Sequence, residues 1–124
     1  MQEKVITIHN WWDGPLTGLA YYHNILCIYE RIFDEIQDDY LDEYYLTPVN
    51  DSEQAEIMME WNAWCQAVSD GNPDLFYQTH TEKDMLRQIL SQSDTKRKYR
   101  KKARFQGSFN PGCLPVDYTV IWSD

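Results

Sequence analysis

The residues near the start of the chain that are best suited to chemistry are His9, Trp11, Trp12 and Asp13, within the stretch HNWWDGP. Imidazole titrates near neutral pH and binds metals readily, and tryptophan offers a broad contact surface. Because neighbouring side chains of a strand point to opposite faces of a sheet, two adjacent tryptophans cannot both enter one core. The second ring must therefore meet a covering helix or a partner. We predict that these four residues contact a ligand or a partner.

A second group of candidate residues lies in the acidic stretch of residues 30–43. Asp34, Asp38 and Asp42 are spaced four residues apart, so a helix here would place them on one face. Such carboxylates can bind Mg²⁺, but no DxDxDG calcium loop accompanies them, which disfavours a cation site. We interpret the stretch as a solvated acidic face that can dock a basic partner, with Asp38, Asp39 and Asp42 as contacts.

Sequence motifs that assemble reactive groups are absent. The chain has no HxH or HExxH histidine pair, no zinc-type spacing of Cys and His, no GxSxG nucleophile turn and no glycine-rich phosphate loop. We therefore predict no cofactor, no metal site and no catalytic residue. The sequence favours a protein that is not an enzyme.

Charge is distributed unevenly along the chain, whose formal net charge is −9 at pH 7. Residues 96–104, KRKYRKKAR, hold seven of the eleven basic side chains. The acidic remainder repels phosphate and disfavours nucleic acid as a partner. We predict that this basic tract is a solvated loop or an edge strand, and a site for phosphate or for an acidic partner is the alternative.

No membrane association is predicted from the sequence. The N-terminal residues lack the apolar run of a signal peptide, and no stretch approaches the ~20 apolar residues that span a bilayer. The three cysteines, Cys27, Cys65 and Cys113, are odd in number and far apart, which is typical of reduced thiols. We expect a cytoplasmic protein.

Periodicity predicts strands at both ends of the chain and helices between them. The expected elements are a strand over 4–12, a hairpin over 19–33 that turns at His23-Asn24, a short helix within 34–45, an extended segment over 45–50, helices over 51–68 and from 81, and strands over 103–109 and 116–123. This order predicts a single α+β domain, residues 1–124. We expect an antiparallel or mixed sheet of about five to six strands with two main helices packed on one face.

The helix over 51–68 carries the clearest local signals. Asn50 followed by Glu53 fits a capping box, in which each side chain bonds to the backbone N–H of the other residue. Ile57 and Trp61 are one helical turn apart, as expected for a buried stripe. The Asp-Gly-Asn-Pro sequence that follows predicts the end of the helix.

Several short motifs follow one another along the chain: Trp12-Asp13-Gly14-Pro15 with Gly18, then Phe33-Asp34, Leu46-Thr47-Pro48-Val49, Trp61 with Trp64, and Val120-Ile121-Trp122. In this combination the chain resembles a family of small uncharacterised bacterial cytosolic proteins, with the pattern WDGPxxG…LTPV…WxxW…VxW. The resemblance implies a bacterial cytosolic protein and brings no activity or functional residue. The basic tract lies outside the pattern.

The leading functional hypothesis is a non-enzymatic module that binds a protein partner, one version being an immunity or antitoxin-like inhibitor of a basic toxin. The alternative is a small-ligand-binding protein or an unusual enzyme. Its pocket would lie between the WWDGPLTG turn and the C-terminal strand, lined by Trp12, Asp13, His9 and Tyr118. A third hypothesis is a homo-oligomer subunit whose tryptophans meet across a two-fold axis.

Overall fold

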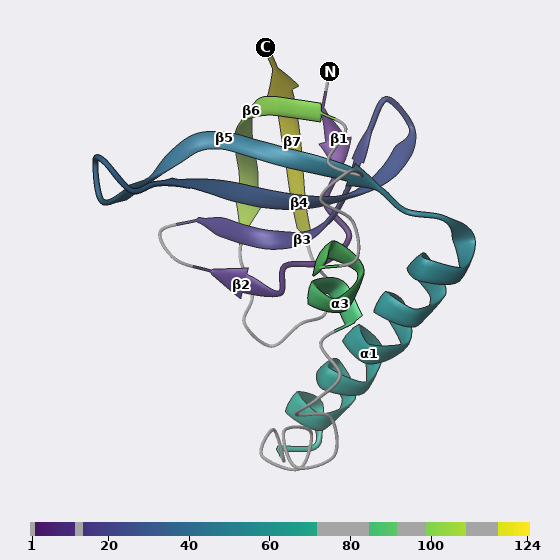
Figure 1. Cartoon of the computed structure of the whole chain (residues 1–124). Coiled ribbons are helices and arrows are strands. Elements are labelled where there is room, and N and C mark those ends of the chain that lie inside the picture. Colours follow the sequence, from purple (N-terminus) through teal and green to yellow (C-terminus); the bar gives the residue numbers. More distant parts are fainter. Residues whose placement is uncertain (1, 12–13, 72–84, 92–98, 109–116) are drawn as a thin grey trace.

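The computed structural model describes residues 2–11, 14–71, 85–91, 99–108 and 117–124 (Figure 1). These residues form seven strands and two helices, labelled as in the figure. The strands are β1 (Glu3–Lys4), β2 (Asn10–Trp11), β3 (Pro15–Tyr22), β4 (Ile25–Asp34), β5 (Asp39–Pro48), β6 (Tyr99–Ser108) and β7 (Asp117–Ser123). The helices are α1 (Asp51–Ser69) and α3 (Met85–Ser91).

The strands form one antiparallel sheet in the order β1-β7-β6-β5-β4-β3-β2. The N-terminal segment bonds to strands at both ends of this order. Val5 N donates to the carbonyl of Tyr118 in β7 (3.1 Å), and Ile6 N donates to that of Leu19 in β3 (2.8 Å). The sheet therefore rolls into a nearly closed barrel. The prediction of an α+β fold with an antiparallel sheet is confirmed, whereas the rolling was not predicted.

The N-terminal segment is not the continuous strand predicted for residues 4–12. It contributes two strands of two residues each, which is why the sheet exceeds the predicted five to six strands. Between them the backbone changes partner from β7 to β3, and the Thr7 hydroxyl accepts a hydrogen bond from Leu19 N (2.9 Å). Closing the barrel requires this change of partner, and it overrides the strand propensity of the β-branched residues.

The predicted hairpin is confirmed in β3 and β4. Its two-residue turn is His23-Asn24, with φ of 49° and 64°, between the paired residues Tyr22 and Ile25. Positive φ at both central residues matches the type I′ turn, whose twist suits a hairpin. β4 lies between β3 and β5 inside the sheet, and side chains on both of its faces are buried.

The short helix predicted within residues 34–45 is wrong. This stretch is the far end of the β4–β5 hairpin, with Asp34 opposite Asp39. Asp34 Oδ1 accepts hydrogen bonds from Ile36 N (2.9 Å) and from Gln37 N (3.4 Å), and Asp38 adopts a φ of 54°. An aspartate that bonds to the backbone two residues ahead favours a turn over a helix. The acidic residues therefore do not share one helical face.

The prediction of a loop or an edge strand for the basic tract is also wrong for the part that the structure describes. Residues 99–104 lie in β6, which is paired with β5 on one side and β7 on the other. Arg100 forms an ion pair with Glu43 of β5 (3.2 Å), and Lys101 pairs with Asp124. The cross-strand acidic partners allow a basic strand inside the sheet. Residues 96–98 lie outside the described residues.

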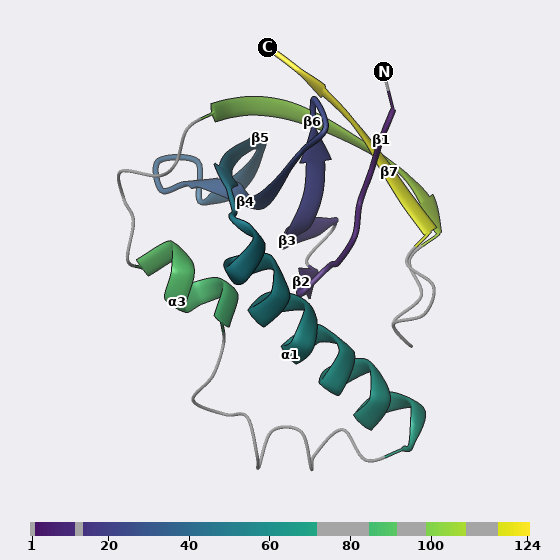
Figure 2. The same cartoon turned by 90° about the vertical axis from the view of Figure 1, so that its right-hand side faces the viewer.

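Helix α1 begins and ends at the predicted signals. Asn50 Oδ1 accepts a hydrogen bond from Glu53 N (2.7 Å), and Glu53 Oε1 accepts one from Asn50 N (3.0 Å), which completes the capping box. The helix ends at Asp70, and the next residue, Gly71, has a φ of 75°. The second predicted helix is present as α3, although its expected start at residue 81 lies outside the described residues. Figure 2 shows the two helices side by side below the barrel.

The two larger clusters of buried side chains lie on the two faces of the sheet, and a small third one is formed by Trp61 and Cys65 of α1. The cluster inside the barrel includes three buried tyrosines, and its buried members are Val5, Ile8, Ala20, Cys27, Tyr29, Tyr44, Leu46, Tyr118 and Val120. The cluster between the sheet and the helices is aliphatic and contains Leu19, Leu26, Ile28, Ile57, Leu86 and Ile89. Successive residues of β3 and β4 alternate between the two clusters, as expected for strands covered on both faces.

Candidate functional site

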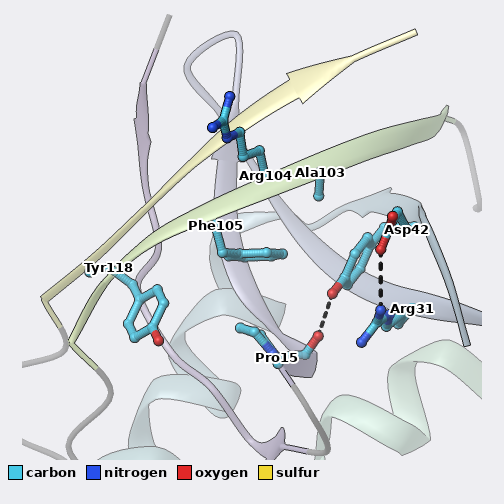
Figure 3. A pocket seen from close by; sticks show the side chains of 10 residues that line it. Pro15, Arg31, Asp42, Ala103, Arg104, Phe105 and Tyr118 are labelled. Carbon is cyan, nitrogen blue, oxygen red and sulfur yellow. Dashed lines mark hydrogen bonds and ion pairs between the residues drawn. The ribbon is translucent and has the colours of Figure 1, made fainter.

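A pocket opens where β5 and β6 diverge. Among the described residues the two strands are paired from Glu43 opposite Lys102 to Leu46 opposite Tyr99. Beyond this stretch β6 continues along β7, while the start of β5 pairs with the end of β4. The resulting pocket has a volume of about 370 Å³ (Figure 3). It is lined by Gly14, Pro15, Arg31, Asp42, Tyr44, Ala103, Arg104, Phe105, Gly107 and Tyr118.

Aromatic rings from the barrel interior form the apolar wall of the pocket. The centroids of Tyr44 and Phe105 are 5.4 Å apart with the rings at 60°, an edge-to-face arrangement. Behind them, Trp122 packs 5.9 Å from both rings. The Tyr44 hydroxyl donates to the Pro15 carbonyl (2.5 Å), which ties β5 to the start of β3. This wall is therefore held in place by ring packing and by a hydrogen bond.

Arg31 supplies a positive charge at the wall, on β4. Its side chain is only 13% exposed, and its Nε donates to the Leu41 carbonyl (2.6 Å). Nη2 lies 3.3 Å from Asp42 Oδ1, and the guanidinium stacks 5.7 Å from the ring centre of Tyr40. Nη1 lies 3.6 Å from the position that a Cβ at Gly14 would occupy. A Cβ there would make only ordinary contact with the guanidinium, so Gly14 is favoured by its φ of 126° and not by lack of space.

Tyrosine hydroxyls in and behind the pocket stay neutral at physiological pH. Burial raises the pKa of Tyr29 well above the ordinary value of 10.0. Burial also raises the pKa of Tyr44, and the nearby Arg31 charge lowers it by less than burial raises it. The pKa of Tyr118 is raised by burial as well. A neutral phenol offers hydrogen bonds and is a poor base at pH 7, so these groups are suited to binding.

The structure places the sequence-predicted contact residues in different parts of the molecule. Asp42 stands at the pocket, whereas Asp38 and Asp39 are exposed at the turn of the β4–β5 hairpin. His9 does not line the pocket; its ring packs 5.0 Å from the ring of Trp61 in α1. That contact gives His9 a structural partner in a covering helix.

The structure does not describe the side chain of Trp11 or of Trp12. Trp12 and Asp13 lie outside the described residues, and the structure describes the backbone of Trp11 but not its side chain. Contact of these residues with a ligand or a partner therefore remains a prediction. The same holds for the homo-oligomer hypothesis, which depends on the two tryptophans.

Sequence reasoning did not identify Arg31, Tyr44 or Phe105 as site residues. One signal was present, because Arg31 is the single basic residue within the acidic stretch of residues 30–43. Gly14 and Pro15 of the WWDGPLTG turn and Tyr118 of the C-terminal strand line the pocket. The pocket thus lies between the two segments named in the small-ligand hypothesis. Of the residues expected to line it, Tyr118 does and His9 does not, and Trp12 and Asp13 lie outside the described residues.

Exposed apolar side chains mark a second surface, at the end of the β4–β5 hairpin. Ile36 is 97% exposed and Phe33 is 45% exposed, with the Phe33 ring packed edge-on against Tyr40 at 5.1 Å. Acidic residues surround them in the sequence, namely Asp34, Glu35, Asp38 and Asp39. Figure 1 shows this hairpin projecting from the barrel at the left of the view.

The described residues also bear on metal binding and on membrane-spanning helices. Within the described parts of the chain, no three His, Cys, Asp or Glu side chains come together in a way that could hold a metal ion. Neither of the helices described is long and apolar enough to cross a membrane. Comparison of the chain with family models, with curated proteins and with solved structures finds no match.

Proposed function

We propose that this protein binds a small molecule in the pocket at the divergence of β5 and β6. The observation that carries the proposal is a largely buried guanidinium, that of Arg31, set beside an aromatic wall in a pocket of about 370 Å³. Sites for small molecules are concave, mainly apolar, and carry a few fixed polar groups within volumes of roughly 300–1,000 Å³. The pocket falls within this volume range and sets the fixed charge of Arg31 beside the rings of Tyr44 and Phe105.

The rigidity of the pocket also supports binding. Tyr44 and Phe105 pack against each other and against Trp122, so the apolar wall exists before any ligand arrives. A pre-formed wall avoids the conformational entropy that a ligand would otherwise lose by ordering side chains. The tyrosines stay neutral at pH 7 and are poor bases. We therefore favour a small-molecule-binding protein over the unusual enzyme named with it in the sequence analysis.

Fragment binding followed by two-dimensional amide NMR tests this proposal. We expect a subset of a fragment library to shift the amide signals of Arg31, Ala103 and Phe105. Ala103 lies on the inner face of β6 and lines the pocket, so Ala103→Leu should fill the space and abolish these shifts. Ala55→Leu, on the exposed face of α1, is the matched control and should leave them intact. A library that shifts no lining amide of the wild type contradicts the proposal.

A second candidate function is the docking of a basic protein by the end of the β4–β5 hairpin. The observation that favours it is the nearly complete exposure of Ile36 among four acidic residues. An apolar side chain can anchor an interface while surrounding charges accelerate encounter and select the sign of the partner. An immunity or antitoxin-like protein that covers a basic toxin is one form of this function.

Affinity capture at two salt concentrations tests the second candidate. We expect a basic protein to be retained at low salt by the wild type and lost by Ile36→Ser. Met59→Ser removes another exposed apolar side chain, from α1, where Met59 is 72% exposed, and should not affect retention. Retention that is equal for both variants rejects the hairpin as the docking element. Both candidate functions fit a bacterial cytoplasmic protein, in which the buried thiols of Cys27 and Cys65 stay reduced.

A further inference from the structure

We propose that the ligand of the pocket is a carboxylate that takes the place of Asp42 on Arg31. This inference rests on the proposed small-molecule function and adds the chemical class of the ligand. In the structure the Arg31 guanidinium is held by the protein, whereas its carboxylate partner is not. An incoming carboxylate can therefore replace Asp42 while the Arg31 guanidinium stays in place.

The guanidinium has a fixed orientation. Its Nε donates to the Leu41 carbonyl (2.6 Å), and its plane stacks on Tyr40. These two contacts set where the terminal nitrogens point, and Figure 3 shows them directed into the pocket. A planar guanidinium that cannot rotate is pre-organised for a carboxylate, which can accept two parallel hydrogen bonds.

The carboxylate of Asp42 is easy to displace. It is 89% exposed and meets Arg31 Nη2 at 3.3 Å, which is long for a charge-assisted hydrogen bond. Ion pairs with an exposed partner contribute little free energy, because water solvates the separated carboxylate almost as well. An incoming carboxylate therefore loses little by releasing Asp42 to solvent.

The remaining walls indicate what the carboxylate is attached to. Phe105 and Tyr118 face the pocket in Figure 3, whereas the Arg104 guanidinium points away from it. Arg31 is thus the cation that the described pocket offers, and one monoanion in place of one aspartate preserves the charge balance. A dianion such as a phosphate ester would add a second negative charge that Arg31 alone does not neutralise. We expect a small aromatic or branched aliphatic acid whose body packs on the rings.

Three probes with the same phenyl ring test whether the ligand must carry a carboxylate. Benzoate, benzamide and phenylphosphonate have the same ring and differ in the head group, so they are titrated in turn into the full chain under amide NMR. We expect benzoate to bind at least about tenfold more tightly than benzamide, and more tightly than phenylphosphonate. Equal affinity for benzoate and benzamide overturns the carboxylate assignment and leaves the small-molecule function intact. Tighter binding of phenylphosphonate overturns it in favour of phosphate.

Variants of Asp42 test the exchange itself. Asp42→Asn removes the competing charge and should strengthen benzoate binding by about fivefold. Asp39→Asn removes the same charge from the same strand outside the pocket, so it should change the affinity less than twofold. If Asp42→Asn weakens benzoate binding, Asp42 positions Arg31 and the exchange model is wrong. If both variants strengthen binding equally, the effect is one of net charge and the exchange model is also wrong.

Arg31→Lys tests the guanidinium, because a lysine retains the charge and loses the planar fork. We expect benzoate binding to weaken at least about tenfold while the aromatic ring signals of the interior remain as in the wild type. Unchanged benzoate affinity in this variant overturns the proposal. If the interior signals change, the benzoate–benzamide comparison in the wild type and the Asp42→Asn result decide the matter. A fragment screen with no pocket shifts counts instead against the small-molecule function.

Discussion

The inside of the barrel and the layer beneath the helices are built from different side chains. The interior combines three buried tyrosines with smaller apolar side chains, and Tyr22, Tyr99, Phe105 and Trp122 pack at the edges of the buried cluster. The buried layer beneath α1 and α3 is built from leucine and isoleucine. Aromatic rings are stiff and meet at preferred angles. The leucine and isoleucine side chains interdigitate at the close packing that is usual for protein interiors.

The barrel interior and the layer beneath the helices also differ in hydrogen bonding. In the interior, the Tyr29 hydroxyl donates to the Thr7 carbonyl (2.8 Å), and Trp122 Nε1 donates to the Tyr21 carbonyl (2.9 Å). Such bonds fix each ring relative to a neighbouring strand. The aliphatic side chains beneath the helices have no polar atoms with which to do this. The layer beneath the helices therefore provides stability, whereas the fixed rings of the interior can keep a pocket open at one end.

The largest expected effect comes from filling the space beside Gly18. A Cβ at this position would lie 2.1 Å from the Thr7 carbonyl oxygen and 2.5 Å from the Tyr29 hydroxyl. Gly18→Ala should therefore separate the N-terminal segment from β3 and cost about 4 kcal/mol in the free energy of unfolding, measured with urea. Gly71→Ala is the control. No atom lies within 4 Å of its Cβ, and its positive φ should cost about 1 kcal/mol. Equal losses would show that Gly18 does not limit closure.

Truncation of Ile57 tests the aliphatic layer. Ile57→Ala should lower the free energy of unfolding by about 3 kcal/mol, because Ile57 is fully buried between α1 and the sheet. The affinity of the pocket for benzoate should stay unchanged, since the space left by the shortened side chain lies between α1 and the sheet, outside the barrel. Urea unfolding and NMR titration of the same variant check both statements. A change in affinity would show that the two layers are coupled.

Alkaline pH should destabilise the interior selectively. The pKa of Tyr29 and of Tyr44 is raised by burial above 10.0, so the unfolded chain loses these protons at a lower pH than the folded chain. The unfolded state then binds fewer protons, and stability falls as pH rises above about 10. Below that pH the contribution is constant. Each tyrosine adds a slope of up to about 1.4 kcal/mol per pH unit. Urea unfolding from pH 8 to 11 should show a shallower decline for Tyr44→Phe, and an unchanged slope for this variant rejects the assignment.

The smallest expected effect concerns a single hydroxyl. Tyr29→Phe keeps the ring and removes the donor to the Thr7 carbonyl, which leaves a buried acceptor without this partner. We expect a loss of about 1.5 kcal/mol in the free energy of unfolding. Amide hydrogen exchange should rise mainly in the N-terminal segment, where the bond is made. Uniform exchange along the chain would indicate that the hydroxyl has no local role in closure.

Local signals in the sequence predicted the parts of the fold that depend on near neighbours. The type I′ turn at His23-Asn24 and the capping box of Asn50 and Glu53 each involve residues within three positions of one another. The strand predicted over 116–123 is confirmed where the structure describes it, and its side chains alternate, with Tyr118 and Val120 buried and Thr119 partly exposed. In these places the backbone conformation follows from the residues themselves.

Barrel closure and the pocket depend on distant pairings, and the sequence does not reveal them. In the stretch after Phe33, Ile36 and Tyr40 fit a helical spacing as well as a hairpin, and pairing with β4 decides between them. Arg31 and Phe105 meet in the pocket because β5 and β6 diverge, a feature of register that periodicity does not encode. Asp42 was predicted as a contact residue because it lies in the acidic stretch, whereas no sequence pattern singled out Tyr44 or Phe105.

The pairing of β1 with β7 sets an order of events during synthesis on the ribosome. Lys4 lies opposite Thr119, so more than a hundred residues are added before the first strand meets its partner. The β3–β4–β5 hairpins form from near neighbours long before that, and they present the tyrosines of the future interior to the surrounding water. The nascent protein is therefore most exposed to aggregation just before β7 leaves the exit tunnel, which is the stage at which a chaperone has most to protect.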